Sequence, residues 1–275
     1  MASEVLKERL SSLRRGQSPS AGVRRAGPPL RSDLGECFPE GAVCETSQGQ
    51  IFTCEIPLRE IHSDASRLTG SYLAAFESAA AAPEGKSLPR HLDLLRLARP
   101  ATTALIDTET AGFHGRPLFL VGMVRWDGKD LLLSQCFARD YSEEAGVLAQ
   151  LAELLPRIEL LISFNGKAFD WPFVRDRMIY HRLPCQPSFA HLDLLHPSRR
   201  RWRSELPNCK LQTLERYLSG RWRSGDLPSA DIPQRYHDFV REQDARLIAP
   251  VFHHNRLDLI TMIELLVALA GGERR

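Results

Sequence analysis

The fold class of this 275-residue chain is decided by residues 102–109, with the sequence TTALIDTE. The β-branched and apolar residues 102–106 form a short continuous run, typical of a buried strand, and acidic residues follow it. Because strand side chains alternate between two faces, Asp107 and Glu109 are expected on the same side of a sheet. Two carboxylates buried together repel each other, and a divalent cation would offset that repulsion. A solvated turn is the alternative interpretation of this pair.

Further strand and helix patterns follow in an order typical of α/β domains. Residues 117–126 (PLFLVGMVRW) and 131–137 predict two strands joined by a turn, and residues 160–164 and 191–195 predict two more. Helices are predicted at residues 143–155 and 172–181, and at about 250–270. We therefore expect residues 100–272 to form an α/β domain with a mixed five-stranded sheet flanked by helices. A three-strand meander would come first in this sheet, and parallel strands would follow.

The first third of the chain carries no obvious catalytic residues. Residues 1–32 are rich in Arg, Ser, Gly and Pro and predict a flexible basic tail, either a solvated terminus or a weak tether for nucleic acid. Residues 33–99 predict a small accessory segment, with a hairpin within residues 37–61 and an Ala-rich helix at residues 65–82.

Composition places the chain among globular proteins. Lys and Arg number 36 against 34 Asp and Glu, so the net charge is +2, and 43% of the residues are hydrophobic. No apolar run approaches the length of a membrane span, and the N-terminus lacks the apolar region of a secretory signal. We therefore expect a cytoplasmic protein without membrane segments. The six cysteines form no C-x-x-C pair, and the spacing of Cys37, Cys44 and Cys54 is poor for zinc.

Two more acidic residues stand at or within predicted helices. Asp170 follows the turn signal Asn165-Gly166, at a position where it would otherwise be a helix N-cap. Asp258 lies in VFHHNRLDLITMIELL, one turn after a histidine, where a local ion pair is the alternative. With the first pair, these residues supply the hard oxygen ligands that suit Mg²⁺ or Mn²⁺. Two such ions can clamp the oxygens of a phosphoryl displacement.

Three short motifs resemble those of the DEDD 3′–5′ exonucleases, a superfamily with the ribonuclease H-like fold. They are Asp107-x-Glu109, Asn165-Gly166-x-x-Phe169-Asp170 and His253-x-Asn255-x-x-Asp258. The middle motif is similar to that of the proofreading domain of family-B DNA polymerases. Residues 118–124 (LFLVGMV), 191–195 (HLDLL), 200–202 (RRW) and 211–215 (LQTLE) add a resemblance to the YprB-type ribonuclease H-like domain, over about residues 100–270.

The resemblance implies roles for the acidic residues and for one histidine. It implies that two metal ions, Mg²⁺ or Mn²⁺, are held by Asp107, Glu109, Asp170 and Asp258. The general base in the superfamily is a His in the spacing H-x₄-D or a Tyr in the spacing Y-x₃-D. His253 has the first spacing and His254 occupies the Tyr position, so either can be the base, and the spacing favours His253. Neighbouring helical residues point about 100° apart, so only one is expected to reach the site.

A basic segment lies between residues 196 and 223, where Arg and Lys are interleaved with Trp202 and Trp222. Arginine together with an aromatic ring suits a phosphate backbone and stacked bases. The candidates for guiding a nucleic-acid strand are Arg200, Arg201, Trp202 and Lys210, and a solvated loop whose Trp residues fill the core is the alternative. Further candidates for contacts with a terminal nucleotide are Thr108, Phe113 and Asn165, in or near the acidic motifs.

The leading hypothesis is a metal-dependent 3′–5′ exonuclease that acts on a single-stranded 3′ end of DNA or RNA. An unidentified processivity or repair partner would accompany it. A non-catalytic nucleic-acid-binding module of the same fold and a structure-specific endonuclease are the alternatives. Fold alone does not decide among these, because unrelated functions share one fold.

Overall fold

The structure is a computed structural model that describes residues 32–83, 88–112, 115–185 and 188–271. Phe113 and the predicted basic tail, apart from Ser32, lie outside the described residues. Residues from Ser32 onward form one compact unit.

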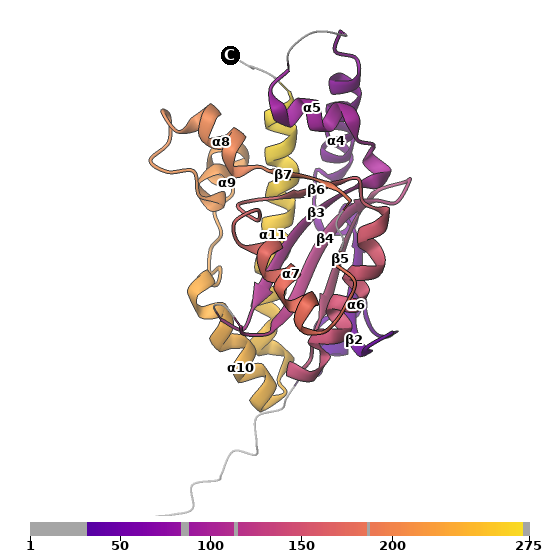
Figure 1. The fold of residues 1–275 in the computed structure, drawn as a ribbon. Coiled ribbons are helices and arrows are strands. Elements are labelled where there is room, and N and C mark those ends of the chain that lie inside the picture. The colour runs from indigo at the N-terminus through magenta and orange to yellow at the C-terminus, as the bar shows by residue number, and fades with distance from the viewer. Residues whose placement is uncertain (1–31, 84–87, 113–114, 186–187, 272–275) are drawn as a thin grey trace, which may run out of the picture. The chain divides into compact units, whose positions relative to one another are not determined.

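A seven-stranded sheet runs through the centre of the molecule (Figure 1). Its strands lie in the order β1-β2-β5-β4-β3-β6-β7. They are β1 Gly41–Thr46, β2 Gly49–Pro57, β3 Thr103–Thr110, β4 Leu118–Trp126, β5 Leu131–Phe137, β6 Leu160–Ser163 and β7 Ala190–Asp193. The neighbouring strands β1–β2, β2–β5, β5–β4 and β4–β3 are antiparallel. The pairs β3–β6 and β6–β7 are parallel. The predicted mixed sheet, a meander followed by parallel strands, is therefore confirmed.

The sheet has seven strands instead of the five predicted, because the N-terminal hairpin joins it. Residues 52–57 of β2 pair with residues 132–137 of β5. Without the hairpin, β5 would be an edge strand with unpaired backbone groups, and β2 satisfies them. The side chains of Ile51, Phe52, Cys54 and Ile56 are buried as a result. The predicted hairpin is thus present, and it extends the main sheet.

Helices cover both faces of the sheet (Figure 1). They are α2 Leu34–Cys37, α3 Leu58–Ile61, α4 Ala65–Ala80, α5 Arg90–Leu97, α6 Glu144–Leu154, α7 Asp170–Tyr180, α8 Leu195–Trp202, α9 Leu211–Ser219, α10 Ile232–Glu242 and α11 Ala245–Ala270. One apolar cluster joins β3 to α6 and α7, and another joins it to α4, α9 and the C-terminal half of α11. Ile106 points into the first cluster and Leu105 into the second, as strand alternation requires. Asp107 and Glu109 follow Leu105 by two and four residues on β3, so they belong to the same face of the sheet as Leu105.

The long C-terminal helix α11 begins earlier than predicted. The side chain of Asp244 accepts a hydrogen bond from the backbone N–H of Arg246, and the helix then runs through Pro250 to Ala270. The residues from His253 to Asp258 therefore lie on one unbroken helix.

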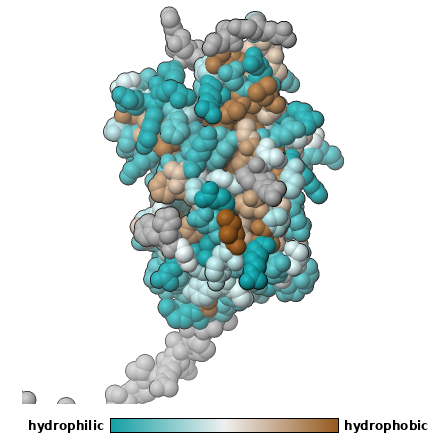
Figure 2. All heavy atoms as spheres, viewed as in Figure 1, coloured by the Kyte–Doolittle hydropathy of each residue, from teal (hydrophilic) through white to brown (hydrophobic). Residues whose placement is uncertain are grey.

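The face of the molecule drawn in Figure 2 carries many charged and polar side chains. Figure 2 shows one face, on which hydrophilic residues predominate and hydrophobic ones are scattered among them. Within the part of the chain that the structure describes, no helix combines the length and the apolar character needed to cross a membrane. The six cysteines are free thiols.

Candidate functional site

Strand β3 presents Asp107 and Glu109 toward helix α11. The amide nitrogen of Asn255 on α11 donates a hydrogen bond to Oδ2 of Asp107 at 2.8 Å. Gly122 is the partner of Asp107 on β4, and a Cβ at this glycine would collide with the Asn255 side chain. Gln135 on β5 donates to Oδ1 of Asn255 at 2.8 Å. The amide is thus held from two sides, and it orients the Asp107 carboxylate.

Asp170 is the first residue of α7 and reaches the end of β3. Its Oδ1 accepts a hydrogen bond of 2.6 Å from the Thr108 hydroxyl. Gly166 lies against this carboxylate, since a Cβ there would come 3.0 Å from Oδ2 of Asp170. The turn before the helix closes at Asn165, which has a left-handed φ of 64°. Asn165 and Thr108, both predicted to contact nucleic acid, therefore have structural roles here, and contact with nucleic acid stays a prediction.

The loop before Asp170 is held by Asp193, a buried residue at the end of β7. Its carboxylate accepts hydrogen bonds from the backbone nitrogens of Asn165 at 2.8 Å and Lys167 at 3.2 Å. It also accepts one from the nitrogen of Leu195 at 3.0 Å, where α8 begins. This cap explains why β7 ends at Asp193, two residues before the predicted end of the strand.

Asp258 on α11 completes a group of four acids, which we call the carboxylate cluster (Asp107, Glu109, Asp170 and Asp258). Its Oδ1 forms an ion pair of 2.7 Å with Nη2 of Arg223, from the loop after α9. Its Oδ2 lies 3.5 Å from Nε2 of His254. Asp258 therefore faces both a fixed cation and an imidazole.

Asp107 and Glu109 lie close enough to the other acids of the cluster for those charges to raise their pKa values. The pKa of Asp107 lies well above its usual value, first because of burial and then because of the charges of Asp258 and Asp170. Burial and the charge of Asp107 raise the pKa of Glu109 in the same way. The pKa values of Asp170 and Asp258 are raised mainly by burial. Acids from three segments, β3, α7 and α11, thus lie within electrostatic reach of Asp107 and Glu109, and their joint role as a site stays a prediction.

The two candidate histidines differ in burial and direction. His254 is 3% exposed, and its Nδ1 lies 3.0 Å from Oδ1 of Asp226. His253 is exposed. Each residue of an α-helix turns the chain by about 100°, so His254 lies about 40° from Asp258 around α11 and His253 about 140°. The unbroken helix thus favours His254, whereas the sequence spacing favours His253.

A second group of buried charges, which we call the arginine network, lies beside the carboxylate cluster. Its members are Glu215, Arg221, Arg223 and Glu264. Glu215 is 1% exposed and pairs with Nη1 of Arg221 at 2.7 Å and with Nε of Arg223 at 2.5 Å. Arg221 also pairs with Glu264 at 2.6 Å. These two arginines of the basic segment are therefore used inside the protein.

The predicted strand-guiding residues divide into exposed and buried ones. Arg200, Arg201 and Lys210 are exposed. Trp202 is only 4% exposed and packs in the apolar core, so the expectation of base stacking on its ring is corrected. The exposed tryptophan of this segment is Trp222, at 70%, with the Arg216 guanidinium 3.7 Å from its ring centre.

The carboxylate cluster suits a divalent cation in chemistry and in charge. Its side chains offer only hard oxygens, and burial together with the neighbouring acids raises the pKa values of Asp107 and Glu109. Among the described residues, no group of three or more His, Cys, Asp or Glu side chains is placed to hold a metal ion. Partners within the protein, namely Asn255, Thr108 and Arg223, instead engage three of the four carboxylates. The residues fit a metal, but they do not form a finished cage.

Sequence reasoning missed several residues of this site. Asp226 and Arg223 come from the loop between α9 and α10; Arg223 was part of the predicted basic segment, and Asp226 had no sequence signal. Asp193 looked like an ordinary strand residue. Asn255 stands beside the histidine pair, and its place in the third motif was the one local signal available.

Comparisons with known proteins agree with this architecture. A family model described as RNase_H superfamily matches residues 104–270. The chain is 35% identical over 170 residues to the "Uncharacterized protein YprB" of Bacillus subtilis (strain 168). That match covers 60% of this chain and 41% of the relative, so the chain spans less than half of the relative's length.

Among solved structures, the family B DNA polymerase of the hyperthermophilic archaeon Pyrobaculum calidifontis is similar, with a TM-score of 0.48 and 14% identity. The similarity covers 59% of this chain and 24% of the polymerase chain. The family model covers more than half of the sequence and includes all four acids. The chain belongs to the ribonuclease H superfamily and has its nuclease-type fold.

Proposed function

We propose that this protein is a metal-dependent 3′–5′ exonuclease that hydrolyses phosphodiester bonds of DNA or RNA. The observation that supports the proposal is the carboxylate cluster: acids of β3, α7 and α11 lie near enough to raise the pKa values of Asp107 and Glu109, and His254 lies 3.5 Å from Asp258. A structural cluster would be expected to pair each acid with a cation, as Glu215 and Glu264 pair with Arg221. Uncompensated acids are instead typical of sites that bind a cation.

In this proposal Asp107, Glu109, Asp170 and Asp258 hold two ions, Mg²⁺ or Mn²⁺. When bound, such ions supply Lewis acidity and neutralise the charge of a phosphoryl displacement. Asn255 and Thr108 keep Asp107 and Asp170 in fixed orientations. Ordered ligands of this kind lower the entropic cost of assembling the site.

We assign the proton-accepting role to His254. Its Nδ1–H donates to Asp226, which leaves Nε2 as the atom that faces the carboxylate cluster. Nε2 can take the proton of an attacking water as the water oxygen bonds to phosphorus. The bond from phosphorus to the 3′ oxygen of the preceding nucleotide breaks, this oxygen takes up a proton from solvent, and the terminal nucleoside monophosphate is released. His253, the residue favoured by spacing, is the matched comparison for this assignment.

The substrate in this proposal is a single-stranded 3′ end, and a partner of unidentified nature would supply processivity or deliver repair substrates. A panel of 3′-labelled DNA and RNA strands in Mn²⁺ tests the activity and the sugar preference. Release of labelled mononucleotides is expected, and an Asp107→Ala variant should release none. Cleavage of strands with blocked 3′ ends would show that the protein cuts internally. The proposed activity would then be that of an endonuclease.

His254→Ala and His253→Ala variants test the base assignment on the same substrates. We expect His254→Ala to lose roughly 10²–10⁴-fold in rate and His253→Ala to lose much less. Equal, small losses from both would remove the histidine base from the proposal.

One observation favours the alternative of a non-catalytic nucleic-acid-binding module. The Arg223 guanidinium lies on Asp258 at 2.7 Å and supplies a positive charge within the protein itself. If this ion pair persists in the presence of metal, strands will bind without cleavage. Strand binding with no hydrolysis in Mn²⁺ would establish that alternative.

A further inference from the structure

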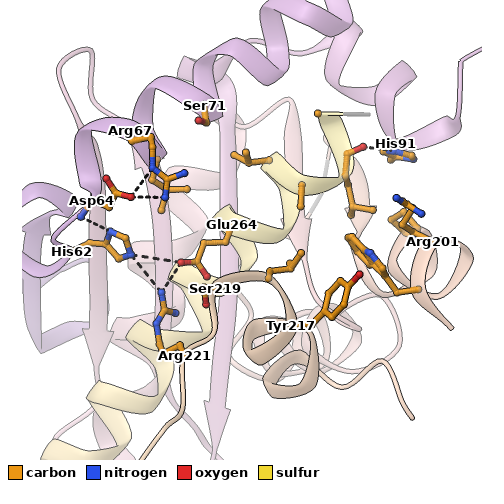
Figure 3. A pocket seen from close by; sticks show the side chains of 18 of the residues that line it. His62, Asp64, Arg67, Ser71, His91, Arg201, Tyr217, Ser219, Arg221 and Glu264 are labelled. Atoms are coloured by element: carbon orange, nitrogen blue, oxygen red, sulfur yellow. Dashed lines mark hydrogen bonds and ion pairs between the residues drawn. The ribbon is translucent and has the colours of Figure 1, made fainter. Parts of the chain in front are cut away.

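A large pocket lies on the same side of the sheet as α11, between two parts of the chain that are distant in sequence. Helices α4 and α5 form one wall, and α8, α9 and the C-terminal half of α11 form the other (Figure 3). Its volume is about 1190 Å³. This exceeds the roughly 300–1,000 Å³ of ordinary small-molecule sites, so the space suits a segment of a polymer.

The residues of the α4–α5 wall precede the part of the chain that matches the family model. Arg67, Ser71 and His91 come from this wall, whereas the match begins at residue 104. The pocket therefore exists only where the N-terminal segment packs against the matched domain.

The positive charges of this pocket exceed its negative charges. Four arginines line it, and the acids that line it are Asp64 and Glu264. Asp64 accepts from Arg67 at 2.6 Å, and Glu264 pairs with Arg221 at 2.6 Å. Figure 3 shows both pairs on one side of the pocket, with Arg201 on the other. Both acids are thus already engaged.

Arg200 and Arg201 are the arginines free to bind a ligand. Arg201 lies 3.7 Å from Glu205, with both side chains nearly half exposed, and such surface pairs contribute little. Arg200 has no carboxylate within ion-pair distance among the described residues. Burial lowers the pKa of the neighbouring His91, and the Arg200 charge lowers it further. The positive charge therefore comes from guanidinium groups, which suit phosphate oxygens.

An aromatic ring stands beside these arginines. Tyr217 lines the pocket, is 49% exposed and has its hydroxyl hydrogen-bonded to Glu205 at 3.0 Å. Its ring edge packs near Trp202, with ring centres 6.4 Å apart. Tyr217 therefore presents a fixed, partly open ring next to two phosphate-binding groups.

The pocket is close to the carboxylate cluster. Glu264 follows Asp258 by six residues on α11, about 9 Å along the helix axis. Arg221 lines the pocket and pairs with Glu264, and two residues later Arg223 pairs with Asp258.

We propose that this pocket binds the backbone of a single nucleic-acid strand near its 3′ end, with Arg200 and Arg201 on phosphates and Tyr217 stacked on a base. The proposal rests on the exonuclease function and adds the strand-binding part of the substrate site. It also gives the N-terminal segment a role, since that segment closes the pocket.

Fluorescence anisotropy with the full chain in EDTA measures binding without hydrolysis. The probes are 5′-labelled single strands of 3 and 12 nucleotides, as oligo-dT and oligo-rU. We expect the wild type to bind the 12-mer at least tenfold more tightly than the 3-mer. The double variant Arg200→Glu/Arg201→Glu should lose most of this gain. In a plot of the logarithm of the binding constant against the logarithm of the salt concentration, the slope should become shallower by about 1.4. This value is about 0.7 for each of the two lost phosphate contacts.

The matched control reverses two exposed charges that do not line the pocket, Lys129→Glu/Arg157→Glu. It has the same change in net charge and should bind within about twofold of the wild type. The proposal that the pocket binds the strand would be overturned by equal losses of affinity in the two double variants. Wild-type affinity in the Arg200→Glu/Arg201→Glu variant would overturn it as well. If the charge reversal unfolds the protein, Arg200→Gln/Arg201→Gln is measured with the same criteria.

Variants of Tyr217 distinguish the contribution of base stacking from that of electrostatic attraction to the phosphates. Tyr217→Ala should weaken 12-mer binding roughly 5- to 150-fold, and Tyr217→Phe should restore it because the ring remains. An alanine variant that binds as the wild type does would overturn the stacking role.

Hydrolysis by the wild type is measured separately in Mn²⁺, so the two proposals fail independently. Pocket-dependent binding with no hydrolysis would refute the exonuclease and leave the pocket. Hydrolysis with pocket-independent binding would refute the pocket alone.

Discussion

Two groups of buried charge lie side by side along α11 and differ in their balance. In the arginine network, Glu215 and Glu264 pair with Arg221 and Arg223, and Arg223 also pairs with Asp226 and Asp258. In the carboxylate cluster, four acids have Arg223 as the one arginine paired with them among the described residues. The pKa values of Asp107 and Glu109 are raised accordingly. The comparison shows that the acids of the arginine network are paired with guanidinium groups, whereas Asp107, Glu109 and Asp170 have no arginine partner among the described residues.

The largest effect is expected from removing one acid of the carboxylate cluster. Asp107→Asn should lower Mn²⁺-dependent hydrolysis on the order of 10⁴-fold, about 5 kcal/mol in activation free energy, because a ligand and its charge are lost. Initial rates on a 3′-labelled strand measure this. Asp176→Asn, at an exposed position of α7, is the control and should keep its rate. Activity retained by Asp107→Asn would place the chemistry elsewhere.

Removing an acid of the arginine network should instead affect stability. Glu215→Gln removes a buried carboxylate that pairs with both Arg221 and Arg223, so the free energy of unfolding should fall by about 3 kcal/mol even though each arginine keeps another acidic partner. Urea denaturation measures it, with the exposed Glu242→Gln as the control. A loss under about 1 kcal/mol would show that the two groups do not differ as described.

A divalent cation should stabilise the protein through the carboxylate cluster. Mn²⁺ at 100 times its dissociation constant should add about 2.7 kcal/mol to the free energy of unfolding. A rise in melting temperature with Mn²⁺ would report this, and Asp107→Asn/Asp258→Asn should show none. An equal rise in the double variant would mean that the ion binds elsewhere.

Neutralising Glu109 should stabilise the metal-free protein by roughly 1–2 kcal/mol. Its pKa is raised in the folded state, so the folded protein holds its proton more tightly than the unfolded chain. Stability in EDTA should therefore fall as pH rises above about 4.5, and Glu109→Gln should flatten that fall. Urea melts at several pH values test the sign. If Glu109→Gln is less stable than the wild type at pH 8, repulsion between Glu109 and the neighbouring acids does not destabilise the metal-free protein.

The smallest effect is expected at His191, outside both groups. Its Nε2 lies 2.8 Å from the Ser163 hydroxyl, and burial lowers its pKa to about 4. The unfolded chain binds a proton below about 6.5, so stability should fall by about 1 kcal/mol as pH falls from 6.5 to 4, allowing for partial exposure. His191→Gln should remove this step and leave the Glu109-dependent change. If His191→Gln shows the same dependence of stability on pH as the wild type, the loss of stability between pH 6.5 and 4 comes from other groups.

Sequence patterns located the central sheet and the four acids well. Alternation on β3 placed Asp107 and Glu109 on one face, and the turn at Asn165-Gly166 placed Asp170 at the start of α7. The patterns did not predict the pairing of β2 with β5, because a strand's partner depends on an edge formed about 80 residues later. They likewise did not show that Trp202 is buried while Tyr217 is exposed.

The sequence by itself determined which acids stand at the ends of β3, at the start of α7 and on α11, since local periodicity and turn chemistry act between near neighbours. Only the tertiary structure decided their partners. Asp226 and Arg223 reach His254 and Asp258 from a separate loop, and α4 and α5 close the pocket against α8 and α9. Such contacts join residues 28 to more than 100 positions apart, and the packing of the whole chain selects them.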